Sequence, residues 1–161
     1  MSGNFKTLTL AAGMGLIAGM RSMAAPALLS HCLSRRVLHR SGRVARFLGS
    51  RRTAGVLKIL AGGEMVADKT PFVPDRIEPP AIGGRAVSGA LCGFAIAEVL
   101  GGPRWGAALL GAAAAVGSTY AAYTVRKAAG ENSSVPDPVL GLAEDAVVLG
   151  AGSRLIAAID H

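Results

Sequence analysis

Long apolar runs dominate this chain, and the first covers residues 7–33. It carries a single charge, Arg21, close to its centre, and Pro26 lies just beyond. At 1.5 Å per residue, a helix over this range spans ~40 Å, enough to cross a lipid bilayer with tilt. The pattern therefore predicts one crossing helix, with Arg21 near the bilayer midplane and a kink after it. Later runs predict three more crossing helices, at about residues 86–102, 105–125 and 139–159.

A shorter apolar run covers residues 53–67 and carries Glu64 near its end. As a helix this run reaches only ~22 Å, less than the ~30 Å thickness of the hydrocarbon layer. The stretch that follows, DKTPFVPDRIEPPAIGG, contains several prolines and cannot be helical throughout. We therefore expect a re-entrant half-helix over residues 53–67 and a proline-rich return that ends near residue 85.

These runs predict an all-α fold, a polytopic membrane helix bundle of about four crossing helices plus the half-helix. The length of 161 residues fits a single integral-membrane domain, residues 1–161. The composition agrees, since 51% of the residues are apolar, only 4% are aromatic and 22 are Gly. Small side chains such as Gly15 and Gly19 allow membrane helices to approach closely. They also offer surfaces for self-association, so we expect a homo-oligomer.

The formal net charge of +7 is concentrated in residues 34–52, an Arg-rich segment without an acidic residue. A basic segment between apolar runs is typical of a cytoplasmic loop that faces anionic lipid headgroups. The candidate headgroup-binding residues are Arg35, Arg36, Arg40 and Arg43. We expect no nucleic-acid partner, because aromatic residues do not interleave with the basic ones and no known binding module is present.

The distribution of basic residues also bears on the path of residues 53–67. If this run dips into the membrane and returns, more basic residues lie on the side of the Arg-rich segment than if it crosses. The positive-inside rule therefore favours the re-entrant path over a full crossing, with the N-terminus outside.

Several ionisable residues are predicted at membrane depth, where they are expensive and usually functional. The candidate site residues are Arg21, Glu64, Asp68, Lys69, Glu144 and Asp145. We expect Arg21 and Glu64 to meet at similar depth and to form charge-assisted hydrogen bonds. The carboxylates outnumber the nearby bases, and an unpaired carboxylate in a membrane must be protonated, hydrated or bound to a cation. The alternative, that these charges only neutralise one another and fix helix register, stays open.

The sequence specifies neither a metal nor a cofactor. Cys32 and Cys92 are isolated among apolar residues and are predicted to be buried thiols. His31 lies beside Cys32, but no third ligand stands nearby, so the spacing does not predict a metal site.

Three short motifs carry a resemblance to a known family. They are Gly19-Met-Arg21-Ser22, Glu64-x-x-Ala67-Asp68-Lys69-x-Pro71, and Leu142-Ala-Glu144-Asp145. Over about residues 10–155 the chain resembles the small bacterial integral-membrane proteins known as domain of unknown function 4126. The resemblance implies a multi-pass protein of the bacterial inner membrane and supplies no chemistry. The long Arg-rich loop departs from the family pattern.

The first functional hypothesis is a small membrane transporter or channel with a buried charged site near the bilayer midplane. The second is a metal-dependent enzyme that acts on a lipid phosphate at the cytoplasmic interface. It ranks lower because no nucleophile or base stands out. A third hypothesis is a non-catalytic membrane scaffold whose basic loop recruits a partner or anionic lipid.

Overall fold

The chain folds into a helical bundle in a computed structural model that describes residues 3–36, 42–67, 78–132 and 137–160. Within these ranges there are seven helices and no strand, which confirms the all-α class. The helices are α1 (Gly3–Met20), α2 (Ala24–Leu33), α3 (Arg43–Leu48), α4 (Arg51–Ala67), α5 (Pro79–Leu100), α6 (Arg104–Asn132) and α7 (Asp137–Asp160).

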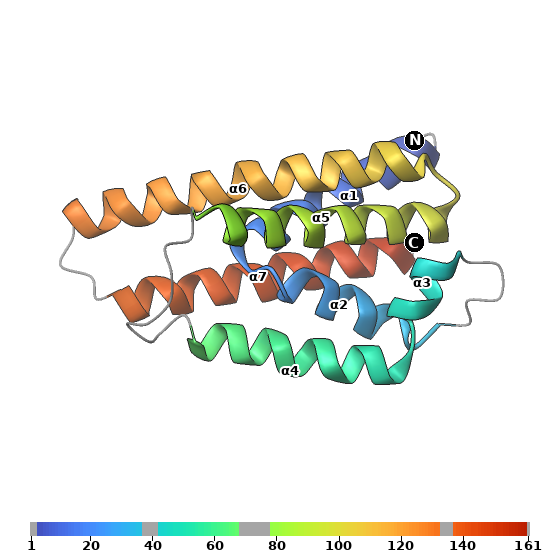
Figure 1. Cartoon of the computed structure of the whole chain (residues 1–161), viewed down its shortest axis with the longest axis horizontal. Helices are drawn as coiled ribbons and strands as arrows, with labels where there is room; N and C mark the ends of the chain where they lie inside the picture. Colours follow the sequence, from blue (N-terminus) through green and yellow to red (C-terminus); the bar gives the residue numbers. More distant parts are fainter. Residues whose placement is uncertain (1–2, 37–41, 68–77, 133–136, 161) are drawn as a thin grey trace.

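The first apolar run is not one helix. It breaks at residues 21–23, and α2 then turns back toward the end of the bundle where α1 begins (Figure 1). The prediction of a single crossing helix over residues 7–33 was therefore wrong. The reason is Pro26, which lacks an amide proton and whose ring clashes with the carbonyl four residues earlier, that of Ser22. We call α1 and α2, with the turn between them, the hairpin.

The path of α4 also differs from the expected one. It begins near α3 and runs along the bundle to the opposite end, where α5 begins (Figure 1). The expected return is therefore wrong for residues 78–85. Pro79 and Pro80 occupy the first turn of α5, where the missing amide protons cost nothing, so this segment extends the helix instead. Residues 68–77 lie outside the part of the chain that the structure describes.

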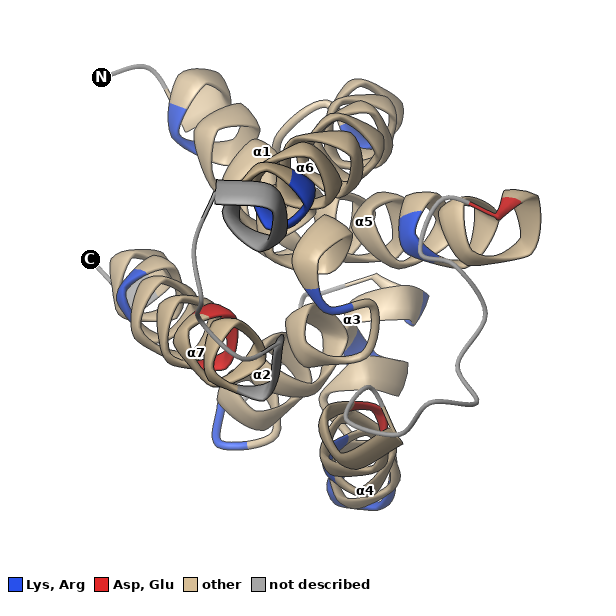
Figure 2. Cartoon of the chain, turned by 90° about the vertical axis from the view of Figure 1, so that its left-hand side faces the viewer, with Lys and Arg blue, Asp and Glu red and all other residues tan. Residues whose placement is uncertain are grey.

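Helices α1, α5 and α6 pack with their backbones in close approach. A Cβ atom added to Gly89 of α5 would lie 2.4 Å from the carbonyl oxygen of Gly111 in α6. A Cβ atom added to Gly15 of α1 would lie 2.3 Å from the same oxygen. Glycine is required at these positions because any side chain would separate the helices. Seen end-on, the three helices form one group, and α2 lies between this group and α4 (Figure 2).

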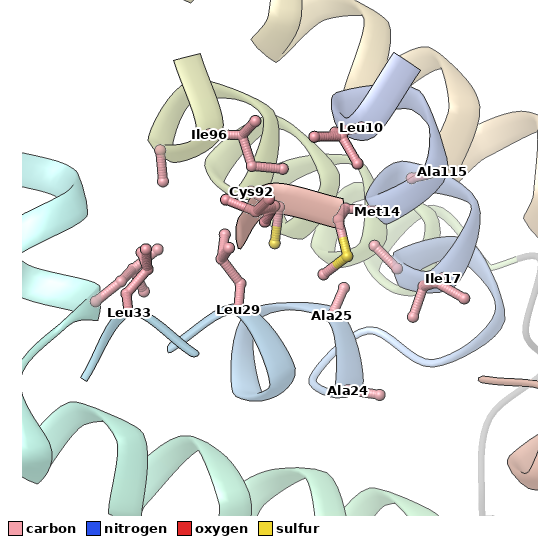
Figure 3. Packing of buried hydrophobic residues seen from close by; sticks show 14 of the residues in the cluster. Leu10, Met14, Ile17, Ala24, Ala25, Leu29, Leu33, Cys92, Ile96 and Ala115 are labelled. Atoms are coloured by element: carbon pink, nitrogen blue, oxygen red, sulfur yellow. The ribbon is translucent and has the colours of Figure 1, made fainter. Parts of the chain in front are cut away.

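The core lies between the hairpin and α5. Met14 of α1 and Leu29 of α2 point toward Cys92 and Ile96 of α5 (Figure 3). All four side chains are buried. Cys92 and Cys32 are both buried free thiols, as the sequence predicted. The inner face of the hairpin is therefore held on α5 mainly by apolar burial.

The outer surface of the bundle is rich in apolar side chains. Two of the described helices, over Pro79–Leu100 and Arg104–Ala128, are long and apolar enough to cross a membrane. Only 22% of the second is buried, so most of this apolar helix is accessible from outside. Ile59 of α4 and Leu109 of α6 are among the large exposed residues. A soluble monomer rarely exposes so much apolar surface, which indicates association with a membrane.

Replacing Gly89 with Ala should destabilise the bundle by about 1–3 kcal/mol, because the added methyl group forces α5 and α6 apart. The matched control is Gly83→Ala in the same helix, where an added Cβ meets nothing within 4 Å. That control should be neutral or slightly stabilising. Thermal unfolding of the detergent-purified variants measures the difference, and equal midpoints would contradict the packing described here.

Candidate functional site

The break between α1 and α2 leaves backbone groups without helical partners inside the bundle. Side chains from other helices satisfy them. The Thr119 hydroxyl of α6 donates to the carbonyl of Gly19 at 3.1 Å, and the Ser88 hydroxyl of α5 donates to the carbonyl of Ser22. Ser88 lies near the middle of the 22-residue α5, so the turn sits at the mid-level of the bundle.

Glu64 of α4 caps the start of α2. One of its carboxylate oxygens accepts hydrogen bonds from the backbone N–H and the hydroxyl of Ser22, both at 2.8 Å. The other accepts from the backbone N–H of Met23 at 2.8 Å. Met23 is the N-cap residue of α2 and has no capping side chain of its own. A carboxylate here satisfies free amide protons and lies at the positive end of the helix dipole.

Arg21 is almost fully buried, with 1% of its surface exposed. Its Nε donates to Oδ1 of Asp145 in α7 at 2.8 Å. The sequence analysis paired Arg21 with Glu64, whereas the structure joins Glu64 to the two residues after it. Pairing with a buried carboxylate is what allows a guanidinium to lie inside the bundle.

Glu144, the neighbour of Asp145, faces another helix. Its Oε2 lies 2.8 Å from an amino nitrogen of Arg126 in α6. Consecutive residues on a helix point ~100° apart, so the Glu144–Asp145 pair holds both α6 and the hairpin. Arg126 is not among the site residues predicted from the sequence. Its adjacency to α7 follows from the short connection between α6 and α7.

A pocket of about 230 Å³ opens between α6 and α7 beside the end of α1. Its lining includes Met20, Arg126 and Glu144, and most of the other residues are apolar. Because Met20 directly precedes Arg21, this pocket adjoins the turn.

The structure thus brings Arg21, Glu64 and Asp145 to one turn and places Glu144 next to them. Asp68 and Lys69, the other two candidates, lie outside the described residues. Of the three acidic candidates that the structure describes, Glu144 and Asp145 pair with arginines. Glu64 instead binds three hydrogen-bond donors and has no basic partner among the described residues. No group of three or more His, Cys, Asp or Glu side chains that could hold a metal occurs in the described part of the chain.

The residues predicted to bind lipid headgroups lie in different parts of the structure. Arg35 and Arg36 line a cavity at the end of α2, whereas Arg43 is exposed on α3. Arg40 lies outside the described residues. Helix α3 is anchored by Glu98 of α5, whose carboxylate accepts a hydrogen bond from the backbone N–H of Ala45 at 2.8 Å. The Arg-rich segment is therefore packed against the bundle over residues 42–52.

Comparisons with protein-family models, with curated proteins and with solved structures found no match to this chain. The resemblance to domain of unknown function 4126 stays a prediction, and the site is interpreted from its own geometry.

Replacing Asp145 with Asn should lower the free energy of unfolding by about 3–5 kcal/mol, because it leaves the buried Arg21 guanidinium without its carboxylate. The double variant Arg21→Met, Asp145→Leu should recover much of this loss, since two apolar side chains need no charged partner. The control is Glu78→Gln at the exposed start of α5. Denaturant unfolding in mild detergent measures all three. If Asp145→Asn is as stable as Glu78→Gln, the Arg21–Asp145 pair contributes nothing to stability.

Proposed function

We propose that this protein is a small multi-span membrane transporter or channel for an ion or a small polar solute. In this proposal α5, α6 and α7 cross the bilayer, and α4, whose 17 residues reach ~25 Å, runs beside them through most of its thickness. The hairpin enters the bilayer from one side and leaves by the same side. The apolar outer surface and the two helices long enough to cross support the membrane placement. Irregular backbone at membrane depth is tolerated where protein surrounds it, and the turn at residues 21–23 meets this condition.

The basic residues support an orientation for the bundle. Among the described residues, the basic ones at the end where α1 begins and α3 lies outnumber those at the other end. The first group includes Lys6, Arg35, Arg43, Arg46, Arg51, Arg52 and Arg104, and the second Arg85, Arg126 and Lys127. By the positive-inside rule the first end is cytoplasmic. The N-terminus then lies in the cytoplasm, in place of the outside location expected from an unbroken first helix.

One observation carries the functional proposal: Glu64 binds the start of a half-helix in the middle of the bundle. Half-helices whose N-termini point at anionic groups near the bilayer midplane are a recurrent device of transporters. The Glu64 carboxylate accepts all three of its hydrogen bonds in the ionised form. Protonation turns one of its oxygens into a donor, which weakens the contact between α4 and the hairpin.

The two charged groups of the turn have different roles in this proposal. The Arg21–Asp145 pair is buried, so it holds the hairpin on α7 in a constant arrangement. Glu64 is only half-buried and binds neutral donors, so its charge can change without leaving an unpaired ion. We assign the gating step to Glu64. When it releases α2, the turn becomes accessible from the α4 side, and the pocket between α6 and α7 adjoins the same turn at Met20.

The other hypotheses have less support. A metal-dependent enzyme needs a cluster of carboxylate ligands, and the described residues show none that could hold an ion. A scaffold needs no charge that can change, so it accounts for the Glu64 contact only as a structural cap of α2.

The test is ion flux in proteoliposomes, with gradients of H⁺, Na⁺, K⁺ and Cl⁻ imposed one at a time and each ion followed with a dye that responds to it. We expect Glu64→Gln to change the flux of at least one ion by about tenfold, because losing one charge-assisted hydrogen bond shifts a two-state gate by ~1.5 kcal/mol.

Glu78→Gln is the matched control, since it removes the same charge from an exposed carboxylate that makes no capping hydrogen bond to α5. Its flux should equal that of the unchanged protein. Absence of flux above empty liposomes for every ion, or equal effects of the two substitutions, would contradict the proposal.

A further inference from the structure

Helices α2 and α4 run antiparallel, and the residues between them change from apolar to basic along both helices. Near the turn, Leu28 of α2 lies with Met65 of α4. Nearer the cytoplasmic end, His31 of α2 lies with Lys58 of α4. Beyond them come Arg35 on one side and Arg51 on the other. The two helices therefore form one continuous surface that is apolar at depth and basic at its outer end.

The apolar half of this surface is an open groove of about 210 Å³ between α2, α4 and α7. Leu28, Met65 and Leu149 line it, together with several alanines, and almost all of its accessible surface is apolar. Alanines at 24, 27 and 61 keep the groove open, because larger side chains at these positions would fill it. In the proposed orientation it lies within the cytoplasmic half of the bilayer.

The basic half is a larger cavity of about 700 Å³ at the end of α2. Its lining includes His31, Ser34, Arg35, Arg36, Arg51 and Lys58, and no acidic residue lines it within the described part of the chain. His31 and Lys58 line both the cavity and the groove, so the two spaces adjoin.

We propose that the groove and the cavity together bind one anionic phospholipid, with an acyl chain in the groove and the phosphate-bearing headgroup in the cavity. The polarity of the site follows that of the lipid along its length. Arg and Lys side chains suit a phosphate through charge-assisted hydrogen bonds, and the Ser34 hydroxyl adds a further donor. A zwitterionic lipid fits less well, because its ammonium group would be repelled by the surrounding bases.

The bound lipid also has a structural consequence. It would join α2 and α4 at their outer end, whereas Glu64 joins them at the turn. The site depends on the membrane placement of the bundle and not on transport through it. Lipid binding and ion flux are therefore separate measurements, and either proposal can fail without the other.

The chain offers a charge-matched pair of variants. Arg51→Gln with Lys58→Gln removes two exposed basic residues that line the cavity, and Arg46→Gln with Arg52→Gln removes two exposed ones that do not. Each variant loses two positive charges, so the two have the same net charge. Arg51 and Arg52 are also neighbours at the start of α4. Gel filtration confirms that both keep the size of the unchanged protein.

Native mass spectrometry of the detergent-purified chain then measures binding of phosphatidylglycerol, of phosphatidylcholine with the same acyl chains, and of soluble glycerol phosphate. We expect the unchanged protein to bind one phosphatidylglycerol in preference to phosphatidylcholine. The Arg51/Lys58 variant should bind it about thirtyfold more weakly, the effect of losing two charges beside a headgroup. The Arg46/Arg52 variant should bind within about twofold of the unchanged protein.

Three results would overturn the assignment. Equal losses in both variants would show general attraction to a basic surface. Equal binding of the two phospholipids would remove the role of the cavity. Glycerol phosphate that binds as tightly as the diacyl lipid would show a phosphate site in which the groove holds no acyl chain.

Discussion

The arrangement of this bundle depends on how the backbone is satisfied at residues 21–23. Pro26 prevents the first apolar run from continuing as a helix, and the break exposes carbonyl and amide groups in the interior. Ser88 of α5, Thr119 of α6 and Glu64 of α4 bind these groups, and Asp145 of α7 binds the adjacent Arg21. Four helices thus take their positions from one short turn, because each supplies a polar group that the turn requires.

The two acidic residues at the turn show how burial separates a fixed charge from a changeable one. Asp145 is buried against the guanidinium of Arg21, and the removal of either partner would leave a charge in a medium that solvates it poorly. Glu64 is half-buried and binds neutral donors, so the loss of its charge removes hydrogen bonds without leaving an unpaired ion. The same distinction explains why the predicted loss of stability concerns Asp145, whereas the proposed gating step concerns Glu64.

The α2–α4 interface extends this logic toward the membrane surface. At the turn the two helices meet through Glu64, and farther out they enclose an apolar groove that ends in a basic cavity. Basic side chains packed around a cavity repel one another unless an anion lies between them. The interface therefore has a protein carboxylate at one end and the environment for an anionic group at the other.

The sequence by itself determined the helical class, the extents of α5, α6 and α7 to within a few residues at most ends, and the identity of Arg21 and Asp145 as interior charges. These follow from apolar runs and from the cost of burying ions, which are local properties. Only the tertiary structure decided the direction of α2 after Pro26, the path from α4 to α5, and Asp145 as a partner of Arg21. A proline ends a helix without setting the angle of the next one, and the choice among several acids depends on which helices pack together.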